Sequence, residues 1–191
     1  MKKTAATANN VLIVDDEPNV AAALKRVLND EPYLIYIAGS AEEGMLLLRT
    51  YPVKVVISDE KMPGMHGSEF LSLVHRDFPD VIKIILTGHA SVDAAIRAIN
   101  EGEIYRFFTK PWNDPEIRFA IRAAVEKYDL EEENRKLLNI VRRQALNFRL
   151  LEKHYPGITK LDRDKYGNIM LQDISKDEMS QIVAQIEKEF S

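Results

Sequence analysis

The sequence predicts an α/β protein in which helices cover both faces of a parallel β-sheet. Short apolar runs, typical of strands buried on both faces, alternate five times with segments of helical pattern. Residues that favour turns and helix starts stand between these segments. Regular alternation of this kind indicates successive strand–helix units rather than hairpins, and hence a parallel sheet between two layers of helices.

The expected elements can be placed along the chain. Strands are expected near residues 11–15, 33–37, 53–58, 81–86 and 104–108, and helices near 18–30, 40–50, 66–77, 91–101 and from 114 onward. Pro18 suits the first turn of a helix, and Ser40 with Glu43 forms a capping box. Asp114 and Pro115 are expected as N-cap and first residue of the last of these helices. The strand order expected for this pattern is the flavodoxin-like order 2-1-3-4-5.

Length, composition and charge limit the possible classes of protein. The 191 residues leave room for one full domain and a smaller part, and 46% are hydrophobic, as in ordinary globular proteins. The chain has no cysteine, no apolar run approaching the ~20 residues needed to cross a bilayer, and no apolar segment in its first ten residues. We therefore expect a cytoplasmic protein without membrane contact. The net charge of −4 argues against direct nucleic-acid binding.

Charged and polar side chains stand where the predicted strands end. Asp15 and Asp16 follow one apolar run, and Asp59 follows another. Thr87 and Lys110 end two further runs. Because ligands bind at the carboxyl edge of open α/β sheets, these five residues are expected to form one site on the exposed rim of the sheet. Crowded carboxylates repel one another, so a divalent cation that prefers oxygen ligands, Mg²⁺, is the expected cofactor.

The same residues suit phosphoryl transfer. A carboxylate can act as a nucleophile and form an acyl phosphate, and the reaction depends mainly on positioning and charge neutralisation. In this interpretation Asp59 is the nucleophile, Asp15 and Asp16 hold the metal, and Lys110 is the counter-ion. Thr87 would hydrogen-bond a phosphoryl oxygen. Each residue alone has an ordinary explanation as a helix cap, a surface lysine or a strand residue, but the combination favours a site.

Residues 9–128 resemble the receiver domain of two-component response regulators. The resemblance is carried by the Asp15-Asp16 pair, the loop from Asp59 through Met62-Pro63 to Gly67, Thr87-Gly88 and Lys110-Pro111. It implies that a histidine kinase, or a phosphotransfer protein, donates a phosphoryl group to Asp59. It also implies that Mg²⁺ is bound by the side chains of Asp16 and Asp59, by the backbone carbonyl of Lys61, and by Asp15 largely through water.

The resemblance also implies a switch formed by Thr87 and Phe107. Many members of the family have Tyr at the position of Phe107, so a hydrogen bond from that hydroxyl cannot form here. Inward rotation of the ring behind Thr87 does not require that hydroxyl. On this basis the chain is expected to be no enzyme beyond its self-catalysed phosphorylation and dephosphorylation.

The last predicted helix continues beyond the receiver. No Gly or Pro interrupts residues 116–153. A stripe with alternating spacing of four and three follows the packed part: Leu130, Asn134, Leu137, Val141, Gln144, Phe148 and Leu151. This heptad spacing predicts a homodimer through Leu130–Leu151; the alternative is a helix that covers its own receiver or tail.

The remaining residues predict a small tail. Apolar runs at residues 158–161 and 169–171, separated by Asp164, Gly167 and Asn168, suggest a β-hairpin, and residues 175–190 suggest an amphipathic helix. The expected domains are therefore a receiver at 1–128, an extended helix at 129–153 and a hairpin-plus-helix segment at 154–191.

The output of the protein is left open by the sequence. Residues 129–191 carry no helix-turn-helix pair or P-loop. The first hypothesis is a response regulator that signals to a protein partner or through its dimer. The alternatives are a phosphotransfer intermediate or phosphate sink, or a fragment of a larger regulator whose effector is missing. The lifetime of the phosphorylated form separates the first two hypotheses.

Overall fold

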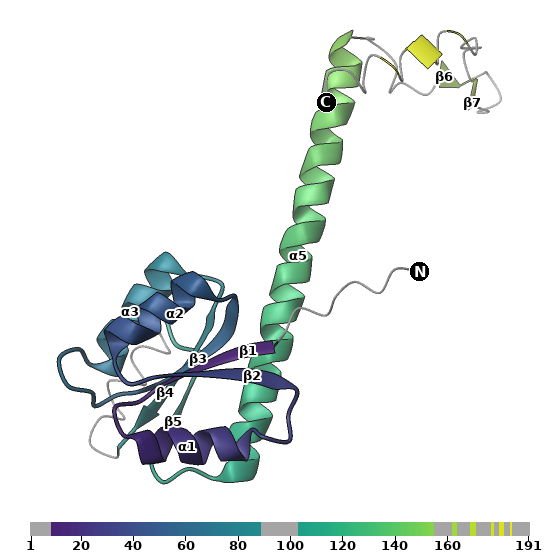
Figure 1. Ribbon diagram of the computed structural model, residues 1–191. Helices are drawn as coiled ribbons and strands as arrows, with labels where there is room; N and C mark the ends of the chain where they lie inside the picture. The colour runs from purple at the N-terminus through teal and green to yellow at the C-terminus, as the bar shows by residue number, and fades with distance from the viewer. Residues whose placement is uncertain are drawn as a thin grey trace. The chain divides into compact units, whose positions relative to one another are not determined.

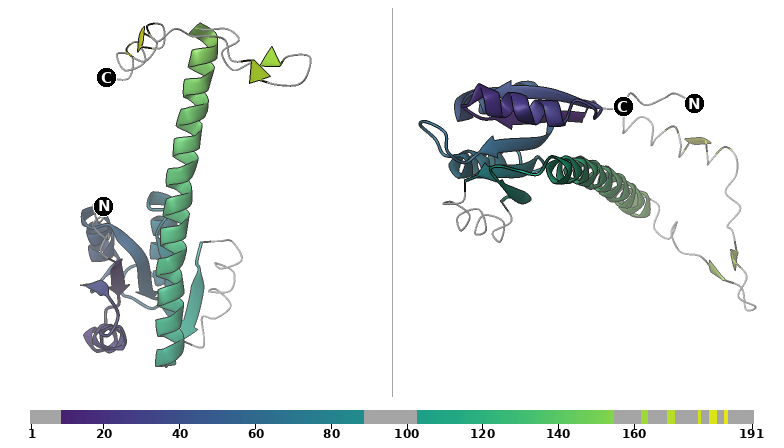
Figure 2. Two further views of the ribbon diagram at one scale, coloured as in Figure 1. Left: turned by 90° about the vertical axis from the view of Figure 1, so that its right-hand side faces the viewer. Right: turned by 90° about the horizontal axis from the view of Figure 1, so that it is seen from below.

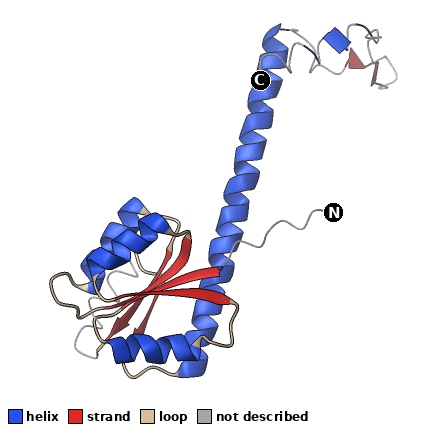
Figure 3. Cartoon of the chain, in the orientation of Figure 1, coloured by secondary structure: helices blue, strands red, loops and turns tan. Residues whose placement is uncertain are grey.

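The computed structural model describes residues 9–88 and 103–154, and within the tail residues 162–163, 169–170, 177, 180–181 and 184. Two compact units are present, Met1–Lys136 and Leu137–Ser191. From β1 (Asn9–Val14) to β4 (Ile82–Thr87), strands and helices alternate along the first unit, as the colours of Figure 3 show. This unit contains the predicted α/β domain.

A five-stranded parallel sheet forms the centre of the first unit (Figure 1). Its strands are β1 (Asn9–Val14), β2 (Tyr33–Ala38), β3 (Val53–Asp59), β4 (Ile82–Thr87) and β5 (Arg106–Thr109). The spatial order is β2-β1-β3-β4-β5, so the predicted flavodoxin-like order is confirmed. The strand bounds lie within two residues of those predicted. The central strands β1, β3 and β4 are buried along almost their whole length, and such strands give continuous apolar runs.

Helices cover both faces of the sheet (Figures 1 and 2). They are α1 (Pro18–Val27), α2 (Ala41–Thr50), α3 (Gly67–Asp77) and α5 (Asp114–His154). One buried cluster joins Leu24 of α1 and Ile117 of α5 to the sheet, and the other joins Phe70 of α3 to the opposite face. Each fully buried side chain of this size contributes about 1.5–3 kcal/mol of hydrophobic stabilisation. The two clusters fix the sheet, and with it the positions of the strand ends.

The predicted helix starts agree with the structure at two of three sites. Helix α1 begins at Pro18, and the Ser40 hydroxyl accepts a hydrogen bond from the Glu43 amide at 3.3 Å. At α5 the predicted cap is wrong by one residue: Asn113 accepts from the Glu116 amide at 3.1 Å, and Asp114 is already helical. Helix α1 ends before residue 30, and the helix expected at 91–101 lies outside the described residues.

Helix α5 is a single helix of 41 residues, as the absence of Gly and Pro predicts. Three ion pairs join it to the rest of the first unit: Arg122 lies 2.6 Å from Glu31, Asp129 lies 2.6 Å from the Lys54 ammonium, and Arg135 lies 2.9 Å from Asp80. The compact unit extends to Lys136, beyond the domain end proposed at 128. The three-part division of the chain therefore stays a prediction.

The described part of the tail contains a short antiparallel pair, β6 (Asp162–Arg163) with β7 (Ile169–Met170). This pair confirms the hairpin, although its first strand comes after the predicted run 158–161. Asp177, Ser180, Gln181 and Ala184 are helical and exposed, which agrees with the polar side of the predicted last helix. The apolar side of that helix lies outside the described residues. Among the described helices, none combines the length and apolar character required to cross a membrane.

Candidate functional site

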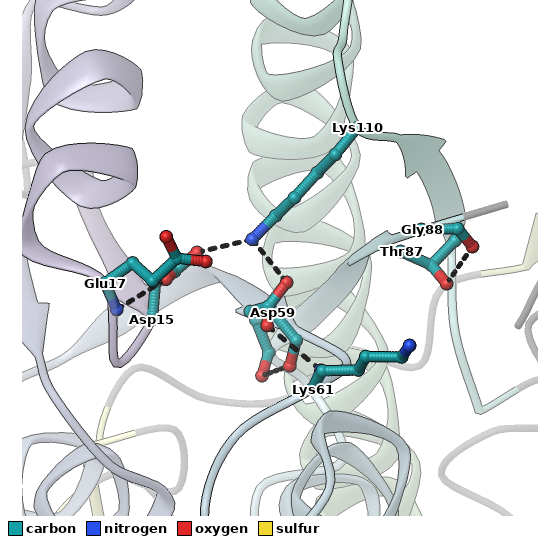
Figure 4. Close-up of polar contacts among 8 residues, drawn as sticks. Asp15, Glu17, Asp59, Lys61, Thr87, Gly88 and Lys110 are labelled. Carbon is teal, nitrogen blue, oxygen red and sulfur yellow. Dashed lines mark hydrogen bonds and ion pairs between the residues drawn. The ribbon is translucent and has the colours of Figure 1, made fainter. Parts of the chain in front are cut away.

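The carboxyl ends of β1, β3, β4 and β5 meet at one edge of the sheet (Figure 4). Asp15 follows the last residue of β1, and Asp59 is the last residue of β3. Thr87 ends β4, and Lys110 follows β5. The register aligns these ends, because Val14 pairs with Ser58 and Thr87 pairs with Thr109. The predicted convergence of these residues is therefore a consequence of the parallel topology.

Lys110 lies between two carboxylates (Figure 4). Its ammonium nitrogen is 3.0 Å from Asp15 Oδ2 and 2.5 Å from Asp59 Oδ1. The Lys110 side chain is 23% exposed, whereas those of Asp15 and Asp59 are 1% and 7% exposed. The expectation that Lys110 occupies an exposed rim is thus wrong: its stem turns inward because two buried carboxylates attract the ammonium group.

These contacts shift the protonation equilibria of the site. Burial raises the pKa of Asp15 above its usual value, and nearby Asp59 adds to the rise, although hydrogen bonds from the Glu17 amide and Lys110 oppose it. For Lys110, burial alone would lower the pKa, but the bonds to Asp59 and Asp15 outweigh burial and raise the pKa above its usual value. The site therefore favours the charged form of Lys110 and disfavours the charged form of Asp15.

The acidic residues also fit a metal ion. One carboxylate oxygen from each of Asp15, Asp16 and Asp59 lies within 4.8 Å of the others. Asp16 is the most exposed of the three. Clustered carboxylate oxygens match the preference of Mg²⁺ for hard oxygen ligands and leave room for the waters that it retains. Of the predicted metal residues, the structure thus brings the three aspartates together.

Lys61, the fourth predicted metal residue, lies in the loop between β3 and α3. Its backbone amide donates to Asp59 Oδ2 at 3.0 Å, while its side chain points away from Asp59 (Figure 4). Gly64 has a φ of +83°, which favours glycine. A Cβ on Gly67 would lie 2.0 Å from the carbonyl oxygen of Asp59, so only glycine fits there. The two glycines let the loop fold back closely on Asp59.

The two predicted switch residues, Thr87 and Phe107, lie in different surroundings. Thr87 is fully buried, and its hydroxyl donates to the Gly88 carbonyl at 3.0 Å. Its own carbonyl accepts from the Lys110 amide at 2.8 Å, so backbone contacts connect Thr87 to the site. The Phe107 ring is half-buried and packs against the core on the α2 and α3 side of the sheet. The structure brings Thr87 to the site and places Phe107 in the adjoining core.

One feature of the site was missed in the sequence. The carboxylate of Glu60 accepts from the Ser68 amide at 2.9 Å and from the Ser68 hydroxyl at 3.1 Å. A sequence signal existed, because Ser68 stands in the first turn of the predicted helix, where free amides attract acidic groups. Glu60, which accepts from the Ser68 amide, lies eight residues upstream and could not be identified from spacing alone.

Comparison with known proteins identifies the family of this chain. The family model of the response regulator receiver domain matches residues 11–122, which is more than half of the chain. The hydrogenase transcriptional regulatory protein HoxA of Cupriavidus necator is 36% identical over 127 residues, covering 66% of this chain and 26% of HoxA. The chain belongs to the response regulator receiver family.

Further relatives show the same fold. The C4-dicarboxylate transport transcriptional regulatory protein DctD of Pseudomonas aeruginosa is 32% identical over 164 residues, covering 83% of this chain and 34% of DctD. The signal receiver domain of an HD domain-containing protein from Pseudomonas fluorescens has a TM-score of 0.64 and 35% identity, over 68% of this chain and 96% of that domain. The matched part of this chain thus spans about a quarter of the length of HoxA and a third of the length of DctD.

Proposed function

We propose that this response regulator accepts a phosphoryl group on Asp59 from a sensor histidine kinase or a phosphotransfer protein. The observation that carries this proposal is the geometry around Asp59: a buried carboxylate at a strand end, an ammonium group 2.5 Å away, and two further carboxylates within metal-binding reach. Receiver family membership supports the same assignment.

The chemistry follows from these positions. A carboxylate oxygen of Asp59 attacks the phosphorus of a phosphohistidine, forming an O–P bond. The N–P bond breaks, and its electron pair leaves with the imidazole nitrogen of the donor. Lys110 neutralises charge that develops on the phosphoryl oxygens, because its ammonium group already faces Asp59. The Thr87 hydroxyl turns from the Gly88 carbonyl to a phosphoryl oxygen.

Asp15, Asp16 and Asp59, together with the backbone carbonyl of Lys61, would hold Mg²⁺. When bound, the ion offsets the negative charge of the carboxylates and of the phosphoryl oxygens. Asp15 already receives hydrogen bonds from the Glu17 amide and Lys110. In this proposal Asp16, which is more exposed than Asp15, binds the ion directly, and Asp15 binds it mainly through water.

Phosphorylation at Asp59 can be tested directly. Incubation of the full chain with Mg²⁺ and a small acyl phosphate donor should add one phosphoryl group, measured by intact-protein mass spectrometry. Asp59→Asn should abolish the mass increase, because the amide is not a nucleophile for this reaction. Asp77→Asn, an exposed-surface control with the same chemical change, should leave it intact. Phosphate retained by Asp59→Asn would show that the acceptor lies elsewhere.

We further propose that the output passes through a homodimer formed along Leu130–Leu151 of α5. Four members of the predicted stripe are strongly exposed: Leu130, Leu137, Val141 and Phe148. Leu138 and Ile140, which the heptad analysis did not include, are also exposed and widen the apolar surface. Exposed apolar surface of this extent favours association. In this proposal the chain signals through protein contacts and catalyses no reaction on another substrate.

A further inference from the structure

We infer that Glu60 is a positioning residue that sets the Mg²⁺ affinity of the acidic site by holding the loop between β3 and α3 in shape. The inference rests on the proposed function, since it concerns the metal held by Asp15, Asp16 and Asp59. Glu60 itself is not assigned as a metal ligand. Its side chain turns toward α3, and its effect on the metal is indirect.

Four hydrogen bonds hold Glu60 between two elements. Its backbone amide donates to the Leu86 carbonyl of β4 at 2.8 Å, and its carbonyl accepts from the Gly67 amide at 2.9 Å. The side chain adds two contacts to α3, with the Ser68 amide at 2.9 Å and the Ser68 hydroxyl at 3.1 Å. The residue that follows Asp59 is thereby fixed to β4 on one side and to α3 on the other.

The side-chain contacts close the loop. The chain leaves the sheet at Asp59 and returns to it at Gly67, whose absent side chain permits contact with the Asp59 carbonyl. Glu60 and Ser68 join the two ends of this loop across its base. The carboxylate also satisfies a free amide in the first turn of α3 and lies at the positive end of the helix dipole.

Lys61 lies inside the closed loop, directly after Glu60. Its amide donates to Asp59 Oδ2, so the orientation of this peptide unit is linked to the orientation of the Asp59 carboxylate. Opening the loop would release both the Lys61 carbonyl and the Asp59 carboxylate from their fixed directions. Residues that orient metal ligands in this way typically change metal affinity by about 10–100-fold when they are removed.

The decisive comparison is between Glu60→Ala and Glu60→Gln. Alanine removes both side-chain bonds to Ser68. Glutamine removes the charge but can still accept from the Ser68 amide and donate to the Ser68 hydroxyl. If position rather than charge matters, Mg²⁺ affinity measured by calorimetry should fall about tenfold in Glu60→Ala and by less than about threefold in Glu60→Gln. Ser68→Ala, which keeps the amide contact, should be intermediate.

A matched control is Glu43→Ala in α2. Glu43 likewise bonds a backbone amide at the start of its helix, that of Gly39 at 2.8 Å, but it is not adjacent to Asp59. Its loss should leave Mg²⁺ affinity within about twofold of the unaltered chain. All titrations are made well below the melting temperature of the least stable variant, with circular dichroism to verify folding.

The outcomes are distinguishable. Unchanged affinity in Glu60→Ala overturns the inference, as does an equal loss in Glu60→Gln, which would assign the effect to charge. An equal loss in Glu43→Ala also overturns it, because helix capping in general would then be responsible. Failure of the unaltered chain to bind Mg²⁺, or binding that Asp16→Ala does not weaken, would instead contradict the proposed metal site.

Discussion

Lys110 is the side chain that balances charge at the acidic edge of the sheet. It contacts both Asp15 and Asp59, and each of these carboxylates is almost completely buried. Removing one partner from a buried ion pair leaves uncompensated charge, which costs more than the pair itself contributes. The side chain therefore has a structural role in addition to its proposed role in phosphoryl chemistry.

We accordingly expect Lys110→Ala to lower the free energy of unfolding by about 1–3 kcal/mol at neutral pH without metal. The physical reason is repulsion between Asp15 and Asp59. Millimolar Mg²⁺ should restore most of the loss, because the cation replaces the missing positive charge. Urea unfolding with and without chelator measures both effects. Lys127→Ala, which breaks an exposed pair with Glu131, is the control and should cost less than about 0.5 kcal/mol. A loss of stability that Mg²⁺ leaves unchanged would contradict the charge explanation.

A second lysine, Lys83 of β4, is buried beside an imidazole ring and a backbone carbonyl. Its ammonium nitrogen lies 3.1 Å from His75 Nδ1 and 3.4 Å from the Pro79 carbonyl, and the residue is 5% exposed. Burial lowers the pKa of Lys83 below its usual value of 10.5. Between the lowered folded-state pKa and 10.5, the unfolded chain binds more protons than the folded chain. The contribution of Lys83 to stability therefore rises with pH across that window.

From this pH dependence of the Lys83 contribution we predict that Lys83→Met stabilises the protein by about 1 kcal/mol near neutral pH. The reason is that methionine carries no charge into the core. The gain should shrink as pH rises toward 10.5, where the lysine itself becomes neutral. Thermal unfolding between pH 7 and pH 10 measures the trend. Lys25→Met, at an exposed position of α1, should show no comparable pH dependence. Destabilisation by Lys83→Met at neutral pH would mean that the contacts to His75 and Pro79 outweigh the burial cost.

At the scale of elements, the loop between β3 and α3 depends on close backbone packing. Gly67→Ala would place a Cβ 2.0 Å from the Asp59 carbonyl oxygen, and backbone atoms must move to accommodate it. We expect a loss of about 1–3 kcal/mol or more in stability, with weaker Mg²⁺ binding because Asp59 moves. Differential scanning calorimetry and metal titration give the two readouts.

Gly39→Ala provides the comparison for the loop prediction. A Cβ at Gly39 meets only the flexible Glu43 carboxylate, at 3.7 Å. Its effect on stability should stay within about 0.5 kcal/mol. Equal behaviour of the two variants would show that the loop can relax around a side chain at residue 67.

Some elements could be predicted from the sequence because local patterns determine them. The central strands β1, β3 and β4 are buried along almost their whole length, so their apolar runs mark them directly. Parallel topology then brings Asp15, Asp59, Thr87 and Lys110 to one edge. The inward position of Lys110 and the buried state of Lys83 could not be predicted in this way. Both depend on the packing of segments that are distant in sequence, and a lysine in isolation is expected at the surface.

At the scale of the whole molecule, helix α5 also has one feature that the sequence predicts and one that it does not. The length of α5 was predictable from the absence of Gly and Pro, but the end of its packed part was not. Asp129 and Arg135 continue the contacts of α5 with the receiver through ion pairs to Lys54 and Asp80. Lys54 is almost buried, and its ammonium group also bonds Asn9. A receiver that ends at residue 128 would lose these contacts, so Lys136 is the better end point for a separate receiver.

The proposed dimer predicts how the oligomeric state depends on α5. The full chain should be a dimer, whereas the chain shortened to Lys136 should be a folded monomer, because it retains the ion pairs but loses most of the exposed apolar stripe. Leu137→Asp combined with Val141→Asp should also yield a monomer, since burying two unpaired carboxylates in an apolar interface is strongly unfavourable. Asp59 phosphorylation should persist in both.

Arg142→Asp with Arg143→Asp changes charge without removing apolar surface from the stripe and is the matched control. Light scattering, with and without the phosphoryl donor, gives the masses. A monomeric full chain in both states would refute the dimer, and a mass that changes on phosphorylation would identify association through α5 as the output of the switch.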